Sequence, residues 1–157
     1  MKHLRSPARA AAVVVILFSM FAVSTSAQAT AGRKGTDEPA VGAMAWTPTL
    51  TPFDSTRERV YRNLSGTARN YWLTFCRAGY LCVAAGQGDG LHTVYHLYYC
   101  GERSLRNFID AGAVRNRQTD EAVARLKDIS RVTKREIPAD GAIHGVDWRP
   151  IYYLDPC

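Results

Sequence analysis

The chain has 157 residues, of which 20 are Lys or Arg and 14 are Asp or Glu, so its formal net charge is +6. This length leaves room for one domain with a modest core. Three of the positive charges lie in the first nine residues, and without them 17 basic residues face 14 acidic ones, a net of +3. That excess is too mild to indicate nucleic-acid binding, and we expect no nucleic-acid partner.

Residues 1–29 have the three parts of an export signal. Lys2, Arg5 and Arg9 precede an apolar stretch over residues 10–23, and Ala27-Gln28-Ala29 supplies a small-x-small cleavage pattern. The apolar stretch is too short for a comfortable membrane span. We therefore expect a signal peptide over 1–29, a secreted protein, and no stable membrane insertion after cleavage.

Residues 30–53 are poor in large apolar side chains and carry three prolines, so we predict a flexible leader there. Residues 54–64 indicate a short helix, because Ser55 with Glu58 three residues later matches a capping box. A linker to residue 70 would follow this helix. The remainder, residues 71–157, is predicted to be a β domain, which the chain enters through a strand over 70–75.

The segment from Cys76 to Cys100 is predicted to be the centre of this domain. An apolar run over 83–85 leads into Gly86-Gln87-Gly88-Asp89-Gly90, and residues 91–99 then alternate as in a strand. Glycine adopts the positive φ angles that tight turns need. The pattern therefore predicts a hairpin with a glycine-rich turn.

After the hairpin, short segments alternate with Gly and Pro breaks, which is typical of a small all-β domain. Residues 119–128 suit a helix by propensity and a strand by alternation, and we favour the strand. Strands are also expected over 131–137 and within 143–154. We predict a single small domain, and we expect the protein to be a monomer.

All four cysteines follow the signal, and an even number in an exported domain predicts two disulfides. Sequence alone leaves three pairings open. We favour Cys76 with Cys82, which closes a small loop, and Cys100 with Cys157, which ties down the C-terminus.

No catalytic set is recognisable, and we expect a protein that is not an enzyme. His92 and His96 lie four residues apart on a predicted strand, about 13 Å at about 3.3 Å per residue, too far to share one ion. We therefore predict no metal site and no cofactor. Asp89 gives only weak support for calcium, since one acid lacks a second fixed donor.

The segment Cys76-Arg77-Ala78-Gly79-Tyr80-Leu81-Cys82 and the strand after it resemble the small secreted actinobacterial metalloproteinase inhibitors with a βγ-crystallin-like fold. A second likeness covers residues 104–108 and 113–119. The resemblance implies a bacterial Greek-key domain that inhibits a peptidase through a disulfide-braced loop. One departure is clear. The characterised inhibitors have a second closely spaced cysteine pair, whereas Cys100 and Cys157 are far apart.

Our first hypothesis is a secreted, peptidase-inhibitor-like protein that binds another protein, such as a secreted peptidase, through a disulfide-constrained loop. A rigid loop loses less entropy on docking. The candidate contact residues are Arg77, Tyr80, Leu81, Gln87 and Asp89. Two alternatives stay open: a cell-envelope or polysaccharide binding module, and a small secreted hydrolase such as a nuclease that uses His92, His96 or His144.

Overall fold

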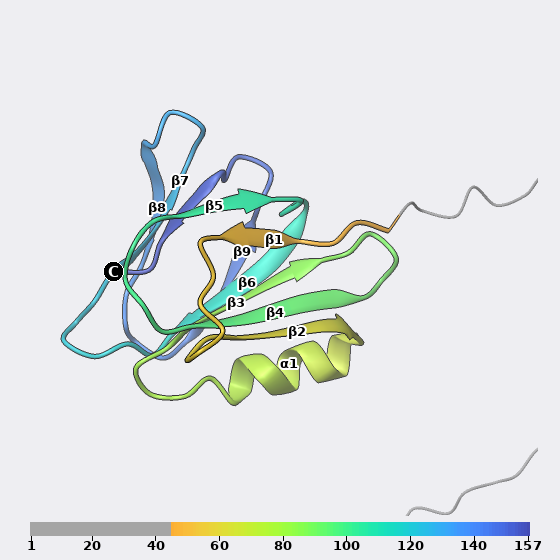
Figure 1. The fold of residues 1–157 in the computed structure, drawn as a ribbon, viewed down its shortest axis with the longest axis horizontal. Helices are drawn as coiled ribbons and strands as arrows, with labels where there is room; N and C mark the ends of the chain where they lie inside the picture. The colour runs from red at the N-terminus through yellow and green to blue at the C-terminus, as the bar shows by residue number, and fades with distance from the viewer. Residues whose placement is uncertain (1–44) are drawn as a thin grey trace, which may run out of the picture. The chain divides into compact units, whose positions relative to one another are not determined.

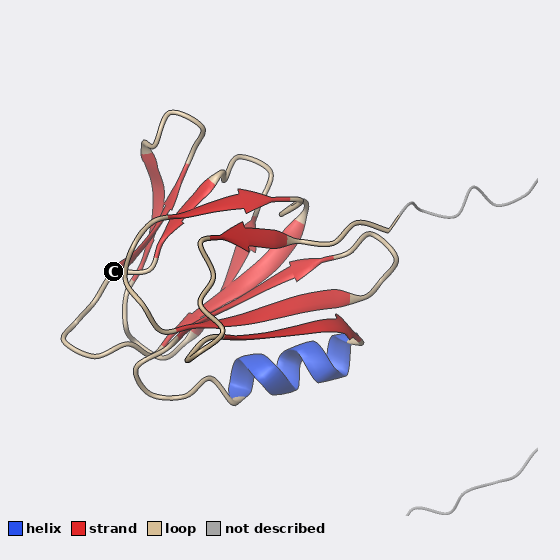
Figure 2. Ribbon diagram, in the orientation of Figure 1, coloured by secondary structure: helices blue, strands red, loops and turns tan. Residues whose placement is uncertain are grey.

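The computed structural model describes residues 45–157, which form an all-β domain with ten strands and one helix (Figure 2). The strands make two antiparallel five-stranded sheets. The predicted signal peptide and residues 30–44 of the predicted leader lie outside the described residues. Within 45–157, no helix has the length and apolar character needed to cross a membrane.

Sheet A has the strand order β1-β5-β10-β7-β8. Its strands are β1 (Thr49–Thr51), β5 (Arg103–Arg106), β10 (Tyr153–Asp155), β7 (Ala124–Lys127) and β8 (Thr133–Ile137). Sheet B has the order β2-β4-β3-β6-β9. Its strands are β2 (Arg59–Leu64), β4 (His92–Leu97), β3 (Leu81–Gly86), β6 (Ala111–Asn116) and β9 (Ile143–Asp147).

The predicted hairpin is present as β3 and β4, which lie in the middle of sheet B. Their register runs from Leu81 opposite Leu97 to Gly86 opposite His92. The Gln87 N–H donates to the Leu91 carbonyl at 2.9 Å. Gly88 and Gly90 have φ angles of 80° and 85°. Glycine is favoured at both positions because a side chain is rarely tolerated in this left-handed region.

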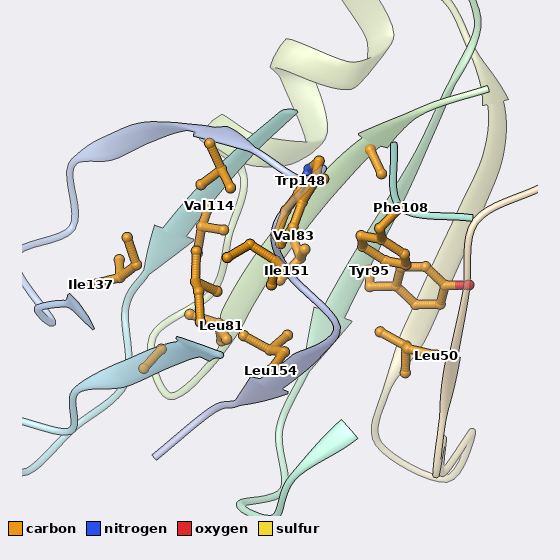
Figure 3. Packing of buried hydrophobic residues seen from close by; sticks show 14 of the residues in the cluster. Leu50, Leu81, Val83, Tyr95, Phe108, Val114, Ile137, Trp148, Ile151 and Leu154 are labelled. Atoms are coloured by element: carbon orange, nitrogen blue, oxygen red, sulfur yellow. The ribbon is translucent and has the colours of Figure 1, made fainter. Parts of the chain in front are cut away.

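The main core lies between the two sheets. Alternate β3 residues, among them Leu81 and Val83, point into it, where they join Phe108 and Trp148 (Figure 3). The indole N–H of Trp148 donates to the carbonyl of Ala84 at 3.0 Å. The long apolar run of β3 follows from this arrangement, because the other face of the same strand is also covered.

Helix α1 (Gly66–Thr74) covers that other face of sheet B and lies alongside β2 in Figure 1. A second apolar cluster fills the space beneath it and includes Leu73, Cys82, Ala84 and Val94. Ser65 caps the helix by accepting the Ala68 N–H.

The structure corrects the predicted positions of the helix and the first strands. Residues 54–64 form a turn followed by β2, and residues 70–75 belong to the end of α1 and its C-cap. Glu58 accepts the Asp54 N–H at 3.0 Å, as a capping-box glutamate would, but its carboxylate is then buried against Arg103. Val60 and Tyr61 pair with β4. Tertiary pairing therefore overrides the local helix signal.

The predicted leader, residues 30–53, extends too far toward the C-terminus. β1 pairs with β5, and Leu50 is buried in the main core. The backbone N–H of Trp46 donates to the backbone carbonyl of Gln87 at 2.8 Å, and the Trp46 ring lies against Gly88. The hydroxyl of Tyr95 donates to the Pro48 carbonyl at 2.8 Å. These contacts make residues 46–51 part of the domain.

The C-terminal half agrees with the preference for strands. β7 lies within residues 119–128, although its strand covers only 124–127. Asp120 and Glu121, with φ angles of 58° and 54°, form part of the turn before it. The structure also contains both predicted disulfides, Cys76–Cys82 and Cys100–Cys157.

Candidate functional site

The disulfide Cys76–Cys82 closes a short loop between the end of α1 and the start of β3. Its backbone is held from a second side by Arg117. The backbone N–H of Gly79 donates to the Arg117 carbonyl at 2.7 Å, and the backbone N–H of Arg117 donates to the Tyr80 carbonyl at 2.9 Å. The Arg117 guanidinium also donates to the Cys76 carbonyl at 3.2 Å. The loop is thus fixed by one covalent bond and by hydrogen bonds to a neighbouring segment.

The structure divides the candidate contact residues between two ends of β3. Arg77 and Tyr80 precede this strand, and Gln87 and Asp89 follow it. The six residues of the strand span about 17 Å at about 3.3 Å per residue, and the two pairs lie beyond its opposite ends. One compact contact surface cannot be built from all of them.

Two of the five candidates are inaccessible to a partner. Leu81 is 0% exposed and lies in the main core, and Gln87 is 3% exposed and donates to the Thr93 hydroxyl at 2.8 Å. Asp89 is exposed, but its carboxylate accepts the Leu91 N–H, as in a structural turn. Arg77 is exposed, and Tyr80 is half-buried with its hydroxyl donating to the Arg57 carbonyl.

An aromatic pair at the C-terminal end of α1, formed by a helix residue and the C-cap, adjoins this loop and was not predicted. Tyr71 and Phe75 are 50% and 57% exposed, and their ring centroids are 4.3 Å apart. Phe75 directly precedes Cys76 in the chain. Positions four apart lie on one face of a helix, so the signal was available once this segment was recognised as helical. Tyr71, Phe75, Arg77 and Ala78 are called the docking face below.

A groove of about 620 Å³ lies beside the same loop. Ala78 and Gly79 form part of its wall, and the disulfide Cys100–Cys157 forms another part. Gln118 also lines it, with its side-chain N–H donating to the Cys157 sulfur at 3.1 Å. The side-chain amide oxygen of Gln118 is buried and has no hydrogen-bond partner among residues 45–157. The groove is therefore bordered by the disulfide Cys100–Cys157 and by the loop that the disulfide Cys76–Cys82 closes.

The tyrosines that follow β4 contribute to this groove, whereas Tyr95 does not. Tyr98 and Tyr99 are half-buried and line it. The guanidinium carbon of Arg57 lies 4.3 Å from the Tyr98 ring centroid. Tyr95 is 2% exposed and belongs to the main core.

The three histidines of the hydrolase hypothesis do not converge. His144 lies on β9, three strand spacings from β4, which is about 14 Å at about 4.8 Å per spacing. His96 is buried under α1 and its Nε2 lies 3.0 Å from the Trp72 carbonyl, so this nitrogen carries the proton. Burial lowers the pKa of His96; burial, followed by the charge of Arg69, lowers the pKa of His92.

No group of three potential metal ligands is present among residues 45–157. Comparison of the chain with protein-family models, with characterised proteins and with solved structures gave no match. The resemblance to the metalloproteinase inhibitors, like the Greek-key topology that it implies, stays a prediction.

Proposed function

We propose that this chain is a secreted binding protein of the peptidase-inhibitor type, which holds a partner protein on the docking face. The observation that carries the proposal is the double fixation of the loop over residues 77–80, by the Cys76–Cys82 disulfide and by the backbone of Arg117. A loop already held in one conformation loses less entropy when a partner binds.

The composition of the docking face supports the same function. Tyrosine, phenylalanine and arginine are enriched at protein interfaces, and tyrosine and arginine supply many of their energetically dominant contacts. Tyr71 and Phe75 are half-exposed, and Arg77 has no ion-pair partner among residues 45–157. Exposed aromatic side chains next to a rigid loop favour a protein partner over a small metabolite.

Secretion and a peptidase target rest on further arguments. Two disulfides are typical of proteins that mature in an oxidising compartment, and the sequence of residues 1–29 predicts export. The resemblance around residues 76–82 favours a secreted metallopeptidase as the target. The inhibitory loop of that family is not carried over, because the second cysteine pair closes a 57-residue separation here.

The test is an inhibition assay with the oxidised protein against a panel of secreted metallo- and serine peptidases. We expect one peptidase to be slowed at micromolar protein, and we expect Phe75→Ala and Ala78→Glu each to weaken inhibition at least about tenfold. Ile129→Ala is the matched control, since Ile129 is also an exposed apolar residue but follows β7 in sheet A. No slowing of any peptidase would contradict the inhibitor proposal.

A further inference from the structure

A second concavity, distinct from the groove, lies between the turn before β2 and the disulfide loop. Its volume is about 260 Å³, and its lining includes Arg57, Arg59, Arg77, Tyr61, Tyr80 and His96. No acidic residue is among the residues that line it. We call it the arginine basin.

None of the three basin arginines forms an ion pair with another residue in the described part of the chain. Two are nevertheless held in place. Arg59 donates through Nη1 to the carbonyls of Ser55 and Glu58, both at 2.7 Å. Arg57 is stacked on Tyr98. These contacts restrain Arg57 and Arg59, and each guanidinium keeps donors that have no acceptor among residues 45–157, as expected of a preorganised anion site.

Few acidic residues accompany the basin arginines in the sequence. Residues 59–88 contain Arg59, Arg62, Arg69 and Arg77 and no Asp or Glu. Glu58 is buried, and its carboxylate is occupied by Arg103. Asp54 accepts the hydroxyl and the N–H of Thr56, which also lines the basin, and these hydrogen bonds lower the pKa of its carboxyl, so its negative charge offsets part of the basin's positive charge. Asp54 is the nearest exposed acid in sequence.

We propose that the arginine basin binds a phosphate or sulfate group. Guanidinium forks match tetrahedral oxyanions in geometry and charge. A carboxylate ligand has one negative charge and would leave two of the three arginine charges uncompensated. A doubly charged oxyanion would leave only one uncompensated, so phosphate or sulfate matches the basin better. Tyr61 also lines the basin, and its hydroxyl is a neutral hydrogen-bond donor. This site goes beyond protein docking and does not require a partner protein.

The test is an NMR titration of the oxidised, labelled protein with inorganic phosphate, sulfate and acetate at constant ionic strength. We expect saturable shifts at Arg57, Arg59, Arg77 and the His96 ring with phosphate and sulfate, and binding of acetate at least about tenfold weaker. Arg57→Gln and Arg77→Gln should each weaken phosphate binding about tenfold. Arg149→Gln is the control, because Arg149 is paired with Asp147 outside the basin.

Several outcomes would overturn the proposal: no saturable shift at the basin, equal affinity for acetate, or equal losses in Arg77→Gln and in the control. A titration with polyphosphate distinguishes the source of the group. Tighter binding with a steeper salt dependence indicates a polymer, and equal affinity indicates free phosphate. Because no peptidase takes part, failure of the inhibition assay leaves this result unaffected, and the converse also holds.

Discussion

Glu58 accepts a hydrogen bond from Nη2 of Arg103 at 2.9 Å, and the two side chains are 0% and 5% exposed. The same Glu58 oxygen accepts the backbone N–H groups of Tyr98 and Tyr99, and its other oxygen accepts that of Asp54. Glu58 directly precedes β2 in sheet B, and Arg103 begins β5 in sheet A. The pair therefore joins the two sheets where the chain passes from one to the other.

We predict that Glu58→Gln lowers the free energy of unfolding by about 3–5 kcal/mol, because it leaves the Arg103 charge buried and uncompensated. Denaturant unfolding of the oxidised protein measures the change. The double variant with Arg103→Met should lose less than the sum of the single variants, since each single change removes the same pair. Arg149→Gln, at an exposed pair with Asp147, should change stability little. Additive losses would contradict the coupling.

Gly112 on β6 supports the core through its lack of a side chain. A Cβ at this position would overlap the indole of Trp148 and the carbonyl of Ala84, which are hydrogen-bonded to each other. We predict that Gly112→Ala costs more than about 3 kcal/mol, from overpacking and from the broken buried hydrogen bond. Gly145→Ala on the neighbouring β9 is the control, because its Cβ would meet nothing within 4 Å. Thermal unfolding of both variants checks the prediction, and equal losses would refute it.

The sequence predicted the hairpin and the strands after it because these depend on local signals. The glycines of the turn and the alternation over 91–99 are visible without tertiary information. Helix α1 was missed for a physical reason: Leu73 is its only buried residue, so it lacks a broad apolar stripe. Ser65 falls in the linker that was predicted to follow residue 64, whereas its side chain caps the following helix.

The candidate site was predicted only in part. The disulfide loop could be located from its cysteines, but the fixation by Arg117 joins segments nearly 40 residues apart and leaves no local signal. The burial of Leu81 depends on which face of β3 meets sheet A. The arginine basin combines a turn, β2, the loop and β4. Its only sequence signal is the absence of acids over 59–88.

The two disulfides should contribute unequally to stability. In the chain-entropy model, the Cys76–Cys82 bond across 6 residues is worth about 2 kcal/mol, and the Cys100–Cys157 bond across 57 residues about 4 kcal/mol. We predict that Cys100→Ser with Cys157→Ser lowers the unfolding midpoint more than Cys76→Ala with Cys82→Ala. The smaller pair is nevertheless expected to matter more for inhibition, since it fixes the docking face. The reverse order in both assays would contradict these roles.

Acidification should destabilise the fold through His96. Burial under α1 lowers the pKa of its imidazole in the folded state, while the unfolded chain has the ordinary value of about 6.5. Below that pH the unfolded state binds a proton that the folded state does not, so the free energy of unfolding falls as the pH drops. The stability that neutral His96 contributes is fully present above about pH 6.5, and it declines as the pH falls toward the folded-state pKa of His96.

We therefore predict that unfolding measured between about pH 7.5 and pH 5.5 shows a loss of stability that His96→Gln reduces. Glutamine retains a donor for the Trp72 carbonyl, so the variant separates the titration from the hydrogen bond. His92→Gln should reduce the remaining slope, because the pKa of His92 is lowered as well. An unchanged slope in the double variant would show that neither imidazole is kept neutral by the fold, and the dependence would then have to come from groups other than these two.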